Sequence, residues 1–120
     1  MISNIPWNGP IATVRLAKVN DDFVVNPTKD QMEESSMELV VSGNKDTIVM
    51  VEGEADLISE DVFVEALKFA HEDIKKIIAL QEEIVKEVNP EKRDIPEEKT
   101  NKKLSTALDK ALGDKINDII

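Results

Sequence analysis

The chain contains no cysteine and only one histidine among its 120 residues. Without cysteine it can form neither disulfides nor thiolate metal sites, and we expect a reducing, cytoplasmic location. Positive charge is also scarce, with 15 Lys and Arg against 25 Asp and Glu and a formal net charge of −10. A free-standing nucleic-acid-binding protein needs a basic face to displace counterions from phosphates. Any RNA contact would therefore come from a local patch or from parts outside this chain.

Long apolar segments are absent as well. No run approaches the roughly 20 residues that a membrane helix needs. The opening "MISNIPWNGP" has no basic region followed by an apolar stretch, so we expect no signal peptide. Hydrophobic residues still make up 41% of the chain. That content and the length fit one compact domain with a modest core, with or without an attachment.

The first third of the chain predicts a hairpin followed by a short helix. Residues 10–19, "PIATVRLAKV", alternate and are rich in β-branched side chains, "NDD" has turn chemistry, and "FVVN" at 23–26 is typical of a returning strand. In "PTKDQMEESS", proline and threonine precede acidic residues, which indicates a helix from about Lys29 to Ser35.

A second hairpin is predicted in "MELVVSGNKDTIVMVEGEAD", residues 37–56. Met37, Leu39 and Val41 are expected to share one face, with Val40 on the other. Gly43 and Asn44 can adopt positive φ, which favours a tight turn.

The strand after this turn carries apolar residues at four successive positions. We expect Ile48 and Met50 on one face and Val49 and Val51 on the other. Apolar residues on both faces predict a strand inside a sheet rather than at its edge. Together the two hairpins and the helices predict an α/β (α+β) fold, with one four-stranded, mainly antiparallel sheet and a long helix packed on one face.

The long helix is predicted from residues 59–88, "SEDVFVEALKFAHEDIKKIIALQEEIVKEV". Ser59 is a good N-cap, acidic residues occupy the first turn, and "NP" at 89–90 stops the helix. Its apolar stripe is Phe63, Leu67, Ala70, Ile74, Ile77, Ile84 and Val88. A helix of this length extends roughly 45 Å, which exceeds the width of the small unit before it. We therefore expect Ile77, Ile84 and Val88 to need a surface other than the sheet.

Residues 89–101, "NPEKRDIPEEKTN", form a charged linker with two prolines. A second amphipathic helix is predicted from about Lys102, with an apolar stripe of Leu104, Leu108, Ala111, Leu112, Ile116 and Ile119. We expect residues 1–88 to form the α/β domain and residues 102–120 to be the truncated start of a helical domain. The last helix could cover the long one, or chains could self-associate through their helices.

Four segments of the chain are distinctive, namely "ISNIPWNGPIATVRL", "FVVNPT", "MELVVSGNKDTIVMVE" and "FAHEDIKKIIALQEEIVKEV". They closely resemble the bacterial polynucleotide phosphorylase family, also called polyribonucleotide nucleotidyltransferases. The resemblance is to the C-terminal half of the family's first ribonuclease-PH-like core domain, and the final helix resembles the start of its all-helical linker domain. It covers essentially the whole chain, and "IPWNGP" followed by "VVNPT" is a specific pair.

The resemblance implies a ring-shaped homotrimer that degrades RNA, including mRNA, from the 3′ end. Such an enzyme uses inorganic phosphate, releases nucleoside diphosphates and needs a divalent metal, Mg²⁺, in its second core. The first core builds the ring and the RNA channel, which implies a structural, non-catalytic role for this segment. The alternative is a stand-alone adaptor or oligomerisation domain of ribonuclease-PH-like fold, without a link to RNA turnover.

Glu38, Glu52, Glu54 and Asp56 raise the possibility of a divalent metal, because carboxylates at strand ends are common ligands. The catalytic core of the family has the strand motif Asp-Phe-Lys-Val-Ala-Gly, which resemblance places on residues 38–43. Val40 then occupies the lysine position and can neither bind phosphate nor donate a proton. An acid remains at Glu52, but without the partners of the catalytic core. We therefore expect no catalytic, cofactor-binding or metal-binding residue in this chain.

Two further candidates are aromatic. His71 could be a general base, but it has no serine, cysteine or second acid at nucleophile spacing, which favours a packed or capping histidine. Trp7 could stack on a base, but its large area favours anchoring its segment against the core. The basic residues are scattered and are expected to be solvated, namely Arg15, Lys18, Lys75, Lys76, Lys102 and Lys103. Three methionines are expected to fill the core, namely Met32, Met37 and Met50.

Overall fold

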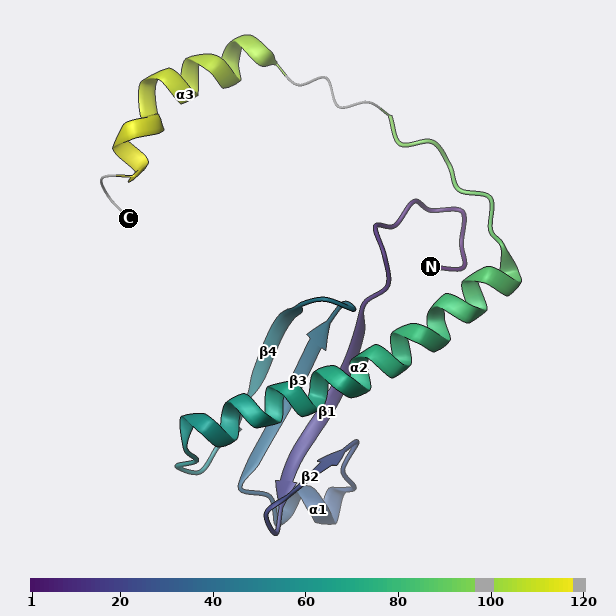
Figure 1. Ribbon diagram of the computed structural model, residues 1–120, viewed down its shortest axis with the longest axis vertical. Coiled ribbons are helices and arrows are strands. Elements are labelled where there is room, and N and C mark those ends of the chain that lie inside the picture. The colour runs from purple at the N-terminus through teal and green to yellow at the C-terminus, as the bar shows by residue number, and fades with distance from the viewer. Residues whose placement is uncertain (97–100, 118–120) are drawn as a thin grey trace.

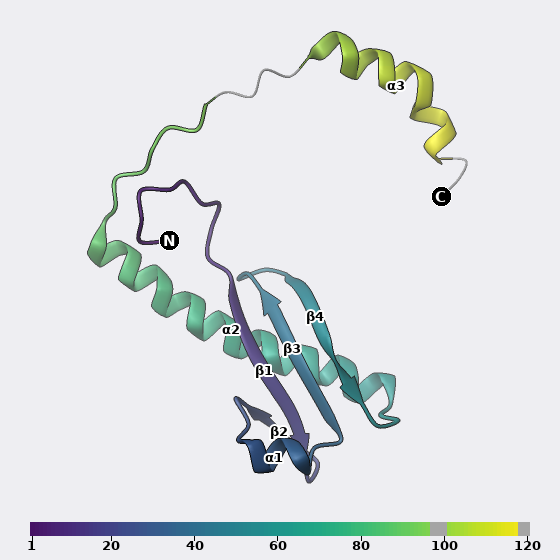
Figure 2. The same ribbon diagram turned by 180° about the vertical axis from the view of Figure 1, so that it is seen from behind.

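The computed structural model describes residues 1–96 and 101–117, so the predicted stripe residue Ile119 lies outside the described residues. The elements are β1 (Ala12–Val19), β2 (Asp22–Val25), α1 (Lys29–Glu33), β3 (Met37–Gly43), β4 (Ile48–Ala55), α2 (Glu60–Val88) and α3 (Lys102–Asn117). The strands form one antiparallel sheet in the order β2-β1-β3-β4, and α2 crosses one face of it (Figure 1). The short helix α1 lies on the opposite face, by the end of β1 (Figure 2). The predicted fold class is confirmed.

The core lies between the sheet and the first two thirds of α2. It is built from alternate residues of β1 and β3 and from every fourth residue of α2. Its fully buried members are Val14, Leu16, Met37, Val41, Ala66, Ala70, Ile74 and Ile78. Met37, Leu39 and Val41 share this face, as predicted. The two alanines let the helix backbone approach the sheet closely, and each buried Leu or Ile contributes about 1.5–3 kcal/mol.

The two hairpin turns are closed by different means. Asn20 and Asp21 have φ of 49° and 71° and form the tight turn between β1 and β2. Gly43 and Asn44 do not have positive φ, so that prediction is wrong. Instead the Asn44 Oδ1 atom accepts hydrogen bonds of 2.8 Å from the amides of Asp46 and Thr47. An asparagine side chain that imitates a backbone turn in this way removes the need for a left-handed residue.

Two predictions about β4 are wrong. A β-bulge places Ser42 opposite Met50 but Gly43 opposite Ile48, so one extra residue, Val49, stands in β4. Ile48 therefore faces α2 while Met50 faces the other way. In addition, the strand order β2-β1-β3-β4 puts β4 at an edge of the sheet, and α2 packs mainly over β1 and β3. Val49, Met50 and Val51 are consequently exposed, and Met50 does not fill the core.

The limits of α2 match the predicted ones. The Ser59 hydroxyl accepts a hydrogen bond from the Val62 amide, and Asn89 ends the helix in the left-handed conformation. Ile77 packs partly buried against the core, so the prediction that it lies beyond the sheet is wrong. Ile84 and Val88 do lie beyond it and remain 41% and 50% exposed. No helix within residues 1–96 and 101–117 is long and apolar enough to cross a membrane.

The N-terminal segment is held against the chain that leaves α2. The Lys92 ammonium donates hydrogen bonds to the carbonyls of Met1, Ser3 and Ile5 at 2.6, 2.7 and 3.2 Å. The Arg93 amide donates to the Asn4 carbonyl at 2.9 Å. Residues 89–96 have no regular secondary structure. Beyond them α3 stands apart from the sheet and from α2 in both views (Figures 1 and 2).

Candidate functional site

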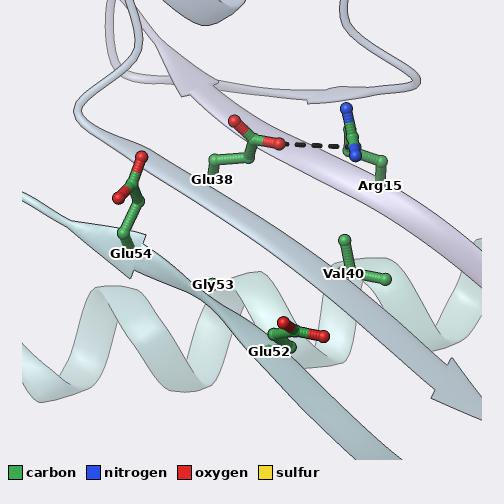
Figure 3. A pocket seen from close by; sticks show the side chains of 6 residues that line it. All are labelled: Arg15, Glu38, Val40, Glu52, Gly53 and Glu54. Atoms are coloured by element: carbon green, nitrogen blue, oxygen red, sulfur yellow. Dashed lines mark ion pairs between the residues drawn. The ribbon is translucent and has the colours of Figure 1, made fainter.

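The face of the sheet that points away from α2 carries a hollow of about 410 Å³ (Figure 3). It is lined by Arg15 of β1, Glu38 and Val40 of β3, and Glu52, Gly53 and Glu54 of β4. These side chains gather here because of strand alternation, since the residues between them on β1 and β3 face α2. The ladder register places Glu54 opposite Glu38 and Glu52 opposite Val40.

One ion pair crosses this hollow. The Arg15 Nε atom lies 3.3 Å from Glu38 Oε1, and the guanidinium also approaches the Met32 sulfur at 3.7 Å. Half of the Arg15 side chain is exposed, so solvent screens the pair and its contribution is about 0–1 kcal/mol. Glu38 and Glu54 are like charges directly opposite each other, an unfavourable arrangement in a ladder. Arg15 offsets that repulsion, and the hollow remains net negative.

Gly53 allows β4 to lie close against β3 at the floor of this region. A Cβ atom at position 53 would stand 2.1 Å from the Glu38 carbonyl oxygen and 2.8 Å from Leu39 Cδ2. Only a residue without a side chain fits such an approach. The spacing of the three glutamates therefore depends on this glycine as well as on the strand register.

The four carboxylates of this region are the sequence-based candidates for a divalent-metal site. In the part of the chain that the structure describes, no group of three or more His, Asp or Glu residues is placed to hold a metal ion. Glu38 is already paired with Arg15, and a hard cation requires several converging oxygens. Asp56, the fourth predicted candidate, lies in the neighbouring hollow, which Glu38 and Glu54 also line. The donor set thus does not fit Mg²⁺ in this region.

The aromatic candidates lie away from the hollow. His71 Nε2 is 3.0 Å from the Asn44 carbonyl oxygen and connects α2 to the turn between β3 and β4. Trp7 is 61% exposed, so the prediction that it anchors its segment in the core is wrong. Its segment is instead held by the hydrogen bonds to Lys92 and Arg93.

Other basic residues form local pairs. Lys75 binds Glu72 at 2.8 Å, Lys76 binds Asp73 at 2.7 Å, and Lys18 binds Asp21. The hydrogen bond from Lys75 lowers the pKa of Glu72. Sequence reasoning missed two lining residues of the hollow, Gly53 and Arg15. No local signal marks Arg15, because its nearness to Glu38 depends on how β1 pairs with β3.

The sequence of the chain is similar to one protein family and to proteins of one name. Residues 9–73 match the family described as "3' exoribonuclease family, domain 2". A polyribonucleotide nucleotidyltransferase of Bacillus subtilis (strain 168) is 45% identical over 115 residues, which is 92% of this chain and 16% of that protein. Proteins of the same name from Natranaerobius thermophilus and Fervidobacterium nodosum are 52% and 48% identical over 78% and 86% of this chain. The chain spans 13–16% of the length of these relatives.

Proposed function

Because the chain belongs to the 3′ exoribonuclease family, through that family's domain 2, we propose that it is a structural, non-catalytic segment of a longer phosphorolytic enzyme. That enzyme degrades RNA from the 3′ end in the cytoplasm and releases nucleoside diphosphates. The relatives' name, polyribonucleotide nucleotidyltransferase, and the small share of their length that this chain covers support the proposal. In this proposal residues 1–88 complete the first core, residues 89–101 are a linker and residues 102–120 begin a helical domain.

The observation that carries the non-catalytic role is the charge of the hollow. Phosphorolysis requires groups that hold inorganic phosphate, yet the open face presents three glutamates, and its one arginine is paired with Glu38. Two like charges 4 Å apart repel by about 1 kcal/mol in water and more near a protein surface. Val40, at the position where resemblance expects a phosphate-site lysine, offers no donor. Phosphate and Mg²⁺ are therefore assigned in this proposal to the second core of the enzyme.

The structural part of the role is supported by surfaces that the chain leaves open. The outer strand β4 has exposed apolar residues, and so does the far end of α2. In a homotrimeric enzyme such surfaces can contact other parts of the same subunit or a neighbouring subunit. RNA would then reach this segment only as part of the assembled channel.

Two assays test the proposal. The isolated chain, incubated with poly(A), inorganic phosphate and Mg²⁺, is expected to release no nucleoside diphosphate above a buffer blank. A release that Glu52→Gln abolishes would contradict the non-catalytic role. The second assay replaces the matching 115 residues of the Bacillus subtilis relative with this chain.

The chimeric enzyme is expected to keep phosphate-dependent release of nucleoside diphosphates, and Glu52→Gln is expected to leave its rate unchanged within about twofold. A chimera that folds but neither assembles nor degrades RNA would instead favour the stand-alone adaptor. Size-exclusion chromatography with light scattering separates failed assembly from failed chemistry.

A further inference from the structure

Two apolar stripes of equal length are uncovered in the structure. One lies on the far end of α2 and the other on α3, and in each stripe every fourth residue is apolar. The stripes are Leu80, Ile84 and Val88 on α2, and Leu104, Leu108 and Leu112 on α3, all between 41% and 57% exposed. Each stripe extends about 12 Å along its helix. Two helices pack when the ridge of side chains at i, i+4 spacing on one helix fits into the groove beside such a ridge on the other.

Charges beside the two stripes are complementary in one orientation. At 100° per residue, Glu83 and Glu87 lie on one flank of the α2 stripe. Lys103 lies on the flank of the same sense beside the α3 stripe, and Asp109 lies on its other flank. Flanks of the same sense meet when two helices pack antiparallel, as in the pairing rules of coiled coils. Antiparallel packing therefore brings Glu87 to Lys103, whereas parallel packing brings the flank of Glu83 and Glu87 to Asp109.

The connection between the helices permits the antiparallel arrangement. Residues 89–101 number thirteen and reach about 43 Å when extended, at roughly 3.3 Å per residue. An antiparallel return has to bridge only the 8–10 Å that separate the axes of packed helices. A short tether also gives α3 an effective concentration near α2 in the millimolar range, which favours the same chain over a second copy as the source of α3.

We propose that α3 of the same chain docks antiparallel on the far end of α2, with Leu104 beside Val88, Leu108 beside Ile84 and Leu112 beside Leu80. In this register Glu87 lies near Lys103. The docked helix continues the apolar core past the end of the sheet. It also makes the chain more compact than the structure with α3 apart, whose radius of gyration is 20.5 Å. A compact chain of this length has a radius near 14 Å.

Small-angle scattering on the dilute full chain, with light scattering for its mass, tests the docking. The parent chain is expected to be monomeric, with a radius clearly below 20.5 Å. Leu108→Asp is expected to bring the radius back toward that value. The matched control is Leu57→Asp, because Leu57 is fully exposed and lies outside both stripes, and it should leave the radius unchanged. Circular dichroism melting confirms that the sheet and α2 stay folded in each variant.

Charge reversal tests the orientation. The variant Glu87→Lys should open the chain, and adding Lys103→Glu should close it again. A parent chain at 20.5 Å that does not respond to Leu108→Asp overturns the docking. A dimer whose mass falls on dilution as the radius rises overturns docking within one chain, because a second copy then supplies α3. A Glu87→Lys, Lys103→Glu double variant that stays open overturns the antiparallel register.

Discussion

Gly53→Ala should destabilise the sheet far more than an alanine normally does. The added Cβ would lie 2.1 Å from the Glu38 carbonyl oxygen, 2.9 Å from Leu39 Cα and 2.8 Å from Leu39 Cδ2. Two of these three atoms are backbone, so rotation of a side chain cannot relieve the overlap. The strand β4 has to move about 1 Å away from β3, which weakens the hydrogen bonds between the two strands.

The expected loss follows from these contacts. Overpacking costs about 1–3 kcal/mol, and backbone contacts place Gly53 at the upper end of that range. Each weakened hydrogen bond between the strands adds up to about 1 kcal/mol to this loss of stability. Alanine also lowers the conformational entropy of the unfolded chain, which offsets the loss by about 0.4–1 kcal/mol. The free energy of unfolding should therefore fall by about 2–3 kcal/mol. At about 4–8 °C per kcal/mol, the thermal midpoint should fall by about 8–24 °C.

Urea unfolding followed by circular dichroism measures this loss. Trp7 is too exposed to report on the core by fluorescence. The matched control is Gly113→Ala in α3, where an added Cβ meets nothing within 4 Å and should favour the helix by about 1 kcal/mol. A Gly53→Ala variant within about 0.5 kcal/mol of the parent, with the same urea dependence, would show that β4 is not packed against β3 as described.

Three further outcomes are expected. Ile74→Ala, at a fully buried site, should cost about 2–5 kcal/mol in thermal melts, whereas Val64→Ala, at a half-exposed site of α2 outside both stripes, should cost under about 1 kcal/mol; equal losses would contradict the described core. Thr28→Ala removes the capping box of α1 and should cost about 0.5–2 kcal/mol in urea unfolding, and Thr28→Ser should restore most of it. The hydrogen bond from Lys18 lowers the pKa of the Asp21 carboxyl in the folded chain. The stabilisation from this contact is therefore present above the pKa that Asp21 has in the unfolded chain, and it is lost as the pH falls through the lower pKa of the folded chain. Lys18→Met should return that pKa toward its ordinary value in an NMR titration, and an unchanged titration curve would rule out the contact.

The features that sequence reasoning predicted well depend on neighbours in the chain. The limits of α2 follow from Ser59 as N-cap and from "NP" at 89–90, and the structure has the helix between them. The alternation of Met37, Leu39 and Val41 likewise requires only the period of a strand. Both signals are local, so they can be interpreted without knowing what packs against them.

The features that were predicted wrongly depend on distant parts of the chain. Val49 becomes a bulge because of how β4 pairs with β3, and nothing in "TIVMVEG" distinguishes a bulge from strict alternation. The apolar faces of β4 suggest an inner strand, but β4 pairs only with β3 and so lies at the edge of the sheet, where α2 does not cover it. The length of α2 alone predicts that Ile77 lies beyond the sheet. Its actual position depends on the angle at which α2 crosses the strands, and helix length does not determine that angle.

The candidate site shows the same division. Alternation places Glu52 and Glu54 on one face of β4, and this can be recognised in the sequence. The pairing of Arg15 with Glu38 cannot, because it requires β1 to lie beside β3 with Arg15 opposite Val40. Register between strands arises from the packed sheet as a whole. The negative charge of the hollow could therefore be predicted in part from the sequence, whereas the ion pair between Arg15 and Glu38 could not.

The hydrogen bonds from Lys92 to the first residues of the chain hold the two ends of the α/β unit next to each other. Met1, Ser3 and Ile5 meet Lys92 although 87 or more residues separate them along the chain. A folded unit whose ends meet can be inserted into a longer polypeptide without forcing the flanking parts away from each other. The parts of a longer protein that precede and follow this unit would stay close to each other, as they do when a surface loop connects them, although the whole sheet and α2 are inserted between them.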